Sequence, residues 1–204
     1  MSLVPTPENT AQEYLDLPLG EFLDRVASDR PAPGGGSVAA VAVALAAGLA
    51  GMAARLSTDQ MDDASELAGR ADASRRRVAP LARADAESYG RVLHALREPA
   101  SENREERIKD ALSGAADVPL VVAEVGSEVA GTAARLVEEG NPNLEGDAMT
   151  AVLLADAGVR AAATLAEINL SAAKVRDDRL ERASKLVDSS AATVRRATGG
   201  EGRG

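Results

Sequence analysis

The chain has 204 residues, a length that suits one domain burying about 70% of its unfolded surface. Its formal net charge of −9 argues against a nucleic-acid partner, because neutralising phosphates requires a basic face. Cysteine is absent and His94 is the one histidine, so disulfide frameworks, thiolate metal sites and histidine metal clusters are excluded, and we expect no metal and a cytoplasmic location.

The aromatic inventory consists of Tyr14, Phe22 and Tyr89. A core with so few large side chains must be built from Ala, Leu and Val on helices that approach one another closely. Such helices bury little area each, so we expect a second copy of the chain to cover part of their apolar surface. The composition therefore predicts a homo-oligomer.

The two ends of the chain differ in composition from the rest. Residues 1–14 are rich in proline and polar residues, and residues 199–204 are glycine and charged residues with nothing to pack. We expect a flexible N-terminal segment, a single helical domain over 15–198 and a disordered tail. No export signal is recognisable, because the segment before the first long apolar run is acidic where a signal peptide would be basic.

The first helix is predicted just after this segment. Asp16 is a suitable N-cap with Pro18 in the first turn. The apolar stripe of this short helix comprises Leu19, Phe22, Leu23 and Val26.

Three successive glycines, Gly34, Gly35 and Gly36, then precede Ser37, a preferred N-cap residue. Bare backbone N–H groups at a helix start suit an anionic or carbonyl-bearing ligand. A dinucleotide fold is excluded because the preceding segment has helical rather than strand spacing, and a P-loop because no lysine occurs before Lys109. The alternative is a loop that only turns the chain.

A central helix over 37–56 is apolar nearly all round, which predicts a buried position in a bundle. Its apolar run is shorter than the ~20 residues of a membrane span, so we expect no membrane association. Residues 63–97 and 102–139 predict long helices, each kinked or broken in two at Pro80 and Pro119.

A loop over 140–146 leads into a helix that runs to about Val175, with Asp147 in its first turn, and Asp177 begins a last helix that ends near Thr198. No segment alternates with period two, so no strand is expected. The predicted fold is an all-α, up-and-down bundle of long kinked antiparallel helices.

Asp85 and Tyr89 share one helix face, which Val92 and Leu96 continue. A carboxylate among apolar neighbours has a raised pKa and suits general acid/base chemistry. The alternative is that Asp85 caps or hydrogen-bonds a neighbouring helix. His94 lies nine positions further on, on the opposite side of the helix, and is expected at the surface.

A second group, Asn141, Asn143 and Asp147, lies at a loop-to-helix junction, where amides can read a heterocycle or can simply cap the helix. Asn169 lies in an apolar stretch of the same predicted helix. It is about 33 Å along the axis from Asp147. The two residues can serve one ligand only at opposite ends of a long molecule or across two subunits.

This set of residues resembles the formiminotetrahydrofolate cyclodeaminase and methenyltetrahydrofolate cyclohydrolase family over about residues 16–195. The resemblance implies an all-helical homodimer that acts on a one-carbon tetrahydrofolate derivative as substrate, without a metal or other cofactor. The matching motifs are Phe22-Leu23-Asp24, Pro33-Gly34-Gly35-Gly36-Ser37-Val38-Ala39-Ala40, Asp85 with Tyr89, Asp117-Val118-Pro119-Leu120, Gly140-Asn141-Pro142-Asn143, Asp147-Ala148 and Ile168-Asn169-Leu170.

Both family reactions pass through a tetrahedral carbon at N5 and N10 of the folate and need protons delivered and removed. We therefore expect Asp147 or Asp85 to act as the general acid/base. The residues expected to bind substrate are Gly34, Gly35, Gly36, Ser37, Tyr89, Asn141, Asn143 and Asn169.

Five positions depart from the family pattern. They are Arg55 where Asn is usual, Glu98 for Lys, Gly146 for Ser, and Leu165 and Glu167 within the usual Asn-Val-Arg-Ile-Asn-Leu. Extra acids would repel an anionic folate tail. The alternatives are a helical dimer that keeps the fold as a ligand-binding or interaction scaffold, or an enzyme acting on another amidine or cyclic imine.

Overall fold

A computed structural model describes residues 14–199, and the predicted flexible N-terminal segment and tail lie outside these residues except for Tyr14 and Gly199. Within them the chain is entirely helical, with no strand, as predicted. The elements are η2 (Tyr14–Asp16), α1 (Leu19–Val26), α2 (Gly35–Arg55), α3 (Ala64–Val78), α4 (Leu81–Arg97), α5 (Arg104–Gly114), α6 (Asp117–Glu139), η3 (Pro142–Leu144), α7 (Glu145–Ala172) and α8 (Asp178–Ala197).

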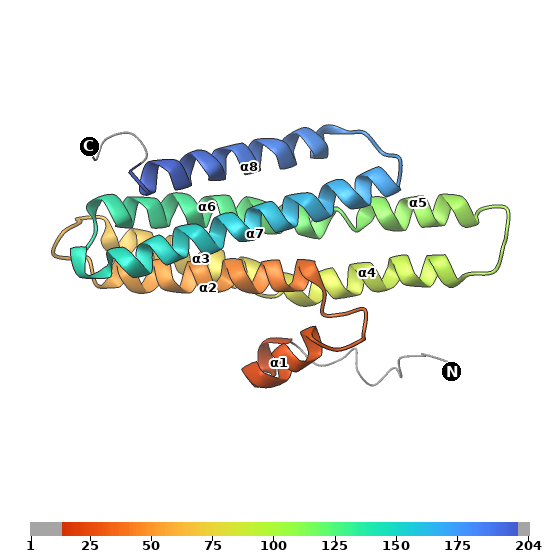
Figure 1. Ribbon diagram of the computed structural model, residues 1–204, viewed down its shortest axis with the longest axis horizontal. Helices are drawn as coiled ribbons and strands as arrows, with labels where there is room; N and C mark the ends of the chain where they lie inside the picture. The colour runs from red at the N-terminus through yellow and green to blue at the C-terminus, as the bar shows by residue number, and fades with distance from the viewer. Residues whose placement is uncertain (1–13, 200–204) are drawn as a thin grey trace.

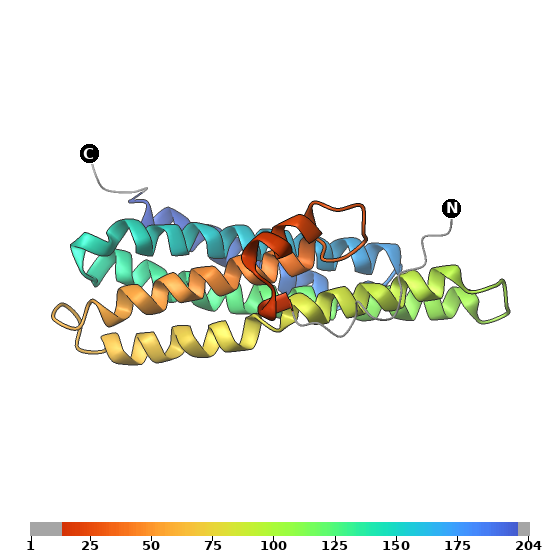
Figure 2. The same cartoon turned by 90° about the horizontal axis from the view of Figure 1, so that it is seen from below.

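The long helices lie side by side in an elongated bundle (Figure 1). Helix α7 packs against α2, α6 and α8, and α2 also packs against α3, α4 and α6. Helices α3 and α4 follow one another nearly in line, and the hairpin of α4 and α5 extends beyond the other helices at one end (Figure 2). Helix α1 lies apart from the bundle, on the side of α2.

The core is built from small residues, as the composition predicts. Along α2, Ala40, Val43, Ala46, Ala47 and Ala50 have no exposed surface. Glycines on two neighbouring helices let the backbones close on this row. A Cβ added to Gly126 would lie 2.7 Å from Val159 Cγ2, and one added to Gly158 would overlap the side chain of Val43. Close backbone approach thus replaces bulky side chains.

Two segments, Gly35–Arg55 and Pro142–Ala172, are long and apolar enough to cross a membrane by length and composition. Their place in the bundle accounts for the same composition, because an inner helix must be apolar on several sides. The predicted central position is confirmed for one side of α2, whereas Val38, Leu45 and Met52 of the same helix are exposed.

Each of the two long predicted helices is broken in two rather than kinked. Pro80 lies between α3 and α4 as the N-cap of α4, where its missing N–H removes no helical hydrogen bond. The second break falls at Ala115 and Ala116, before Pro119. Pro119 occupies the first turn of α6, a position where a helix tolerates proline.

Helix starts differ from the sequence expectation at two points. The N-cap of α2 is Gly34, so the prediction that Ser37 caps this helix is wrong. Pro18 rather than Asp16 precedes α1. Asp177 does cap α8 as predicted, because its side chain accepts a hydrogen bond from the backbone N–H two residues later at 3.1 Å.

Candidate active site

The side chain of Asp85, on the first turns of α4, lies directly against the start of α2. A Cβ added to Gly36 would overlap the carboxyl group of Asp85, so this approach requires glycine at position 36. The contact joins a carboxyl to the helix end where backbone N–H groups are free and the dipole is positive. The glycine segment and Asp85, predicted separately from the sequence, thus meet in one place.

Burial raises the pKa of the half-buried Asp85 carboxyl, and a hydrogen bond from the backbone N–H of Ser37 partly opposes the rise. Desolvation disfavours the charged form of a carboxyl, whereas donors to the carboxylate favour it. The net result is a carboxyl that holds its proton to a higher pH than an ordinary aspartate, a property that general acid/base catalysis uses.

Ser37 is completely buried behind Asp85. Its hydroxyl donates a hydrogen bond to the carbonyl oxygen of Ala82 at 2.6 Å and lies 3.5 Å from Oδ2 of Asp85. The side chain therefore joins α2 to α4 and contacts the candidate acid from its protein side. Its role in binding substrate stays a prediction.

Other side chains surround the open side of this group. A Cβ on Gly35 would lie 3.6 Å from Leu165 of α7. Tyr14 packs edge-to-face on Phe22 with ring centroids 6.0 Å apart, and burial, opposed by Arg25, raises its pKa with a further contribution from the charge of Asp85. Sequence reasoning did not place Tyr14 beside this group, and it noted Leu165 only as a departure from the family motif. The run of glycines was the available signal, because a backbone without Cβ atoms must receive another segment.

The stripe predicted to continue Asp85 along α4 is buried only in part. Val92 is buried, but Tyr89 is 43% and Leu96 47% exposed. The hairpin of α4 and α5 extends beyond the other helices at one end (Figure 2), which leaves part of this face of α4 uncovered. Tyr89, one turn after Asp85, can therefore meet a ligand. His94 is exposed as predicted, with 82% of its side chain accessible.

The second predicted group lies at the other end of α2. The Asn141 side-chain amide donates to the Leu56 carbonyl at 3.0 Å, and its oxygen accepts from the backbone N–H of Asn143 at 3.0 Å. The backbone N–H of Asn141 donates to the hydroxyl of Ser57 at 2.9 Å. Asn141 therefore holds the loop onto the end of α2, which is the capping alternative. Asp147 is half-buried in the first turn of α7, where it was predicted.

The structure does not bring the two candidate acids together within one chain. Asp147 and Asn169 belong to one uninterrupted helix, so their separation along its axis is about 33 Å. Asn169 lies near Leu165, at the Asp85 end, where its amide donates to the carbonyl of Ala115 at 3.0 Å. Asn169 thus fixes α7 to the junction of α5 and α6, and its role toward a ligand stays a prediction.

The positions that depart from the family pattern have distinct surroundings. Arg55 forms an ion pair with Asp72 of α3. The Glu98 carboxylate lies 2.6 Å from Arg107, so its charge is offset locally. Glu167 is exposed, and the space beside Gly146 is open.

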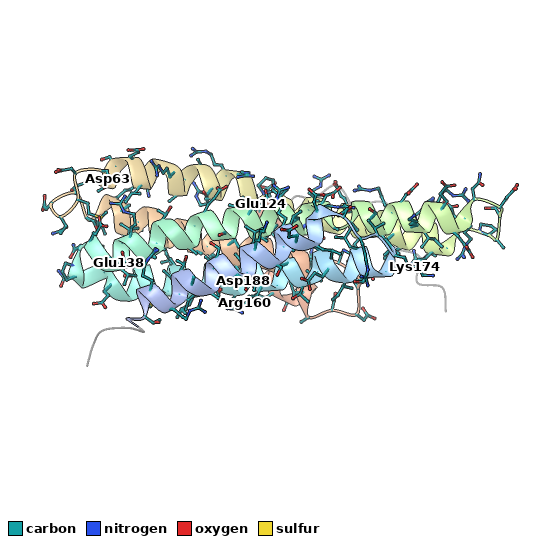
Figure 3. All side chains as sticks on the ribbon, turned by 90° about the horizontal axis from the view of Figure 1, so that it is seen from above. Asp63, Glu124, Glu138, Arg160, Lys174 and Asp188 are labelled. Carbon is teal, nitrogen blue, oxygen red and sulfur yellow. The ribbon has the colours of Figure 1, made fainter. Side chains whose placement is uncertain are left out.

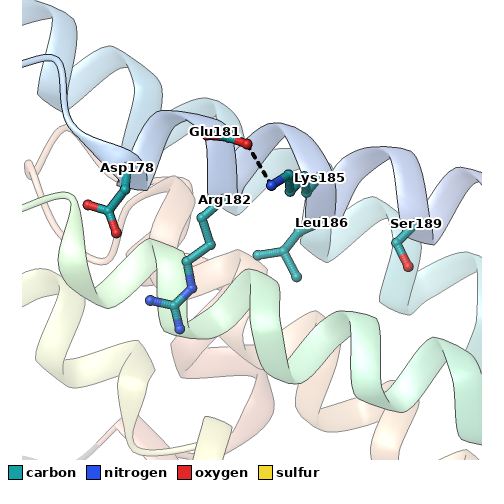
Figure 4. A pocket seen from close by; sticks show the side chains of 6 residues that line it. All are labelled: Asp178, Glu181, Arg182, Lys185, Leu186 and Ser189. Atoms are coloured by element: carbon teal, nitrogen blue, oxygen red, sulfur yellow. Dashed lines mark ion pairs between the residues drawn. The ribbon is translucent and has the colours of Figure 1, made fainter.

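Two grooves lie away from both groups. One, of about 450 Å³, is formed by α8 residues Asp178, Glu181, Arg182, Lys185, Leu186 and Ser189 (Figure 4). The other, of about 570 Å³, runs between α3 and α6. In Figure 4 Lys185 turns to Glu181, 2.6 Å away, as in an ordinary surface ion pair. We therefore base the candidate site on Asp85 and not on these grooves.

Comparisons with known proteins identify the family of the chain. The family model described as formiminotransferase-cyclodeaminase matches residues 18–187. The methenyltetrahydrofolate cyclohydrolase of Methylorubrum extorquens is 35% identical over 169 residues, which are 78% of this chain and 80% of that protein. The formimidoyltransferase-cyclodeaminase of Rattus norvegicus is 32% identical over 175 residues, 78% of this chain but only 31% of the rat protein.

A solved structure supports the same conclusion. The formiminotetrahydrofolate cyclodeaminase of Thermotoga maritima matches with a TM-score of 0.79 and 28% identity, over 92% of this chain and 98% of that one. The chain belongs to the formiminotransferase-cyclodeaminase family. It is a one-carbon folate enzyme of the cyclodeaminase and cyclohydrolase type, and the family predicted from the sequence is confirmed.

The raised pKa of Asp85 predicts a dependence of stability on pH. The folded state binds this proton more tightly than the unfolded state, so the carboxyl lowers the free energy of unfolding as pH rises above the ordinary value of Asp, near 3.9. Asp85→Asn removes this loss of stability, because asparagine does not ionise. Urea unfolding of both proteins between pH 4 and 7 should show the variant gaining stability relative to wild type as pH rises. Asp110→Asn, on exposed α5 surface, is the control, and a pH-independent difference for Asp85→Asn would contradict the assignment.

Proposed function

We propose that this chain is a methenyltetrahydrofolate cyclohydrolase in which Asp85 is the general acid/base. The observation that carries the proposal is the Asp85 carboxyl held against Gly36 at the start of α2, in a chain 35% identical to a protein of that name. This carboxyl is half-buried between buried Ser37 and exposed Tyr89. One side of it contacts the protein, and the other is open to a ligand.

The reaction requires two proton transfers. Water adds to the methenyl carbon that bridges N5 and N10, and Asp85 takes up the proton that the water loses. The carbon is then tetrahedral and carries a hydroxyl group. The hydroxyl loses its proton, the C–N5 bond breaks, and Asp85 returns a proton to N5, which leaves a formyl group on N10 and releases one proton overall. A carboxyl with a raised pKa can act in both directions near neutral pH.

Cyclodeamination is the second candidate, supported by the Thermotoga maritima structure, which covers nearly all of both chains. In that reaction N10 attacks the formimino carbon on N5 and the carbon expels ammonia. The same carboxyl would give its proton to the leaving nitrogen. The two reactions use one acid/base in one place, so they differ in the substrate bound and not in the site required. We also propose a cytoplasmic location, which the cysteine-free composition favours.

The near-ultraviolet absorbance of the methenyl compound tests the function. Its decay with added protein reports cyclohydrolysis, and its appearance from the formimino compound reports cyclodeamination. We expect Asp85→Asn to lower turnover by about 10²- to 10⁴-fold, the usual contribution of a general acid/base, with Asp110→Asn unchanged. Full turnover by Asp85→Asn would refute the role of this residue. A wild-type protein that changes neither signal would favour the scaffold alternative.

The exposed apolar residues support a homodimer. On α2, Val38, Leu45 and Met52 recur every seven residues on one face, and Leu45 is 59% exposed. Exposed Leu153 and Ile168 of α7 and Leu19 and Leu23 of α1 add to the apolar surface. The side seen in Figure 3 instead carries charged pairs, such as Glu138 with Arg196 at 2.8 Å. We call Val38, Leu45 and Met52 the α2 stripe and place the dimer contact there.

A dimer through the α2 stripe would also join the two groups of predicted site residues. Helix α2 has 21 residues and is about 30 Å long, with Leu45 at its middle. A two-fold axis near Leu45, with the two α2 helices nearly antiparallel, places the Asn141 and Asp147 end of one subunit beside the Asp85 end of the other. Each active site would then take residues from both subunits.

The α2 stripe is tested by Leu45→Glu. A charge at the centre of a self-complementary contact faces its own copy, so we expect the variant to be monomeric and to lose most of its turnover with its helix content unchanged. Light scattering after size exclusion and circular dichroism measure these properties. Leu96→Glu, on the exposed end of α4, is the control. A Leu45→Glu variant that stays dimeric and active would place the contact elsewhere.

A further inference from the structure

The hydrogen-bond geometry of Ser37 limits what its hydroxyl can do for Asp85. A serine hydroxyl has one hydrogen and two acceptor lone pairs. Its oxygen lies 2.6 Å from the Ala82 carbonyl, which can only accept, and 3.5 Å from Oδ2 of Asp85. The hydrogen therefore points to Ala82, and the side of the oxygen that faces Asp85 carries a lone pair.

We propose that Ser37 is a positioning residue that accepts a hydrogen bond from protonated Asp85 and so stabilises the neutral carboxyl. In this state the O–H of Asp85 donates to Oγ of Ser37, and the hydroxyl of Ser37 donates to the carbonyl of Ala82. The two hydrogen bonds run in one direction, from Asp85 to Ser37 and from Ser37 to the backbone carbonyl of Ala82. Each donor therefore has an acceptor. The inference rests on the proposed function, because a neutral carboxyl is the form that a general acid needs.

The opposite arrangement is chemically possible and has the opposite effect. Ser37 could turn its hydrogen to an ionised Asp85, which would favour the charged form. That rotation would break the 2.6 Å bond to Ala82 in an interior where Ser37 has no water contact, and an unmatched buried carbonyl is costly. The backbone N–H of Ser37 already serves the ionised carboxyl, so the hydroxyl is not required for that purpose.

The other groups near Asp85 do not bond to the hydroxyl of Ser37, so we expect them to stay in place when Ser37 is changed. Tyr14 of η2 interacts with Asp85, and Arg25, Arg83 and Glu87 surround Tyr14. From α7 the side chain nearest the glycine segment is the uncharged Leu165. Any change in the proton affinity of Asp85 on substitution of Ser37 is therefore caused by loss of the hydroxyl.

The sign of the change in Ser37→Ala decides between the two arrangements. We expect the proton affinity of Asp85 to fall by about 2- to 3-fold, the low end of the worth of one hydrogen bond, because 3.5 Å is long for O–H···O. Carboxyl carbon NMR of the folded, folate-free protein measures this directly. The pH profile of kcat should move to lower pH by the same amount. Ser37→Thr, which keeps the hydroxyl, should restore the wild-type value where it folds.

Ser88→Ala is the matched control, because Ser88 is a buried serine of α4 whose hydroxyl accepts from Arg91 at 3.0 Å. It should leave the titration of Asp85 unchanged. A rise in the proton affinity of Asp85 in Ser37→Ala, or no change, would overturn the inference. Because NMR needs no substrate, this result stands apart from the proposed function, which is tested by the turnover of the wild-type protein and of Asp85→Asn.

Discussion

The contact between the Asp85 carboxyl and the Cβ-free backbone of Gly36 is the constraint on which the rest of the site depends. It joins residues far apart in the sequence, sets the approach of α4 to α2 and brings Ser37 under the carboxyl. Desolvation there raises the pKa of Asp85. A side chain at position 36 would separate α2 from α4 and expose the Asp85 carboxyl to water. Glycine at this position therefore keeps the carboxyl buried and its pKa raised.

The small-residue core explains why one chain holds two separate groups of polar residues. Helices that meet through Ala and Gly can run straight alongside one another, and α7 continues without a break over 28 residues. Asp85 and Asp147 consequently lie near opposite ends of α2. Because these small residues bury little surface, the α2 stripe of Val38, Leu45 and Met52 stays exposed. A second subunit is the simplest way to cover that surface and join the ends.

The sequence was sufficient for the fold class, the start of the last helix at Asp177 and the exposure of His94, because these follow from local periodicity and turn chemistry. Of the predicted α1 stripe only Phe22 is buried, because α1 lies apart from the bundle (Figure 1) and leaves Leu19, Leu23 and Val26 exposed. The predicted Ser37 cap failed because tertiary packing outweighed a local preference: the hydroxyl bonds to Ala82, 45 residues away. Tyr89 is exposed because α4 leaves the bundle, a feature of long-range packing that helix periodicity does not contain. The roles of the remaining site residues rest on the family resemblance, whereas the separation of Asp147 and Asn169 along one helix was predicted from the sequence.

Subunit complementation tests the central proposal, that each active site combines the Asp85 end of one subunit with the Asp147 end of the other. Asp85→Asn and Asp147→Asn are purified separately, then unfolded together and refolded. In a shared site, half of the dimers formed are mixed and each mixed dimer has one site with both aspartates, so about a quarter of wild-type turnover should return. Variants that are each inactive and recover nothing on mixing, despite forming mixed dimers, would contradict the account.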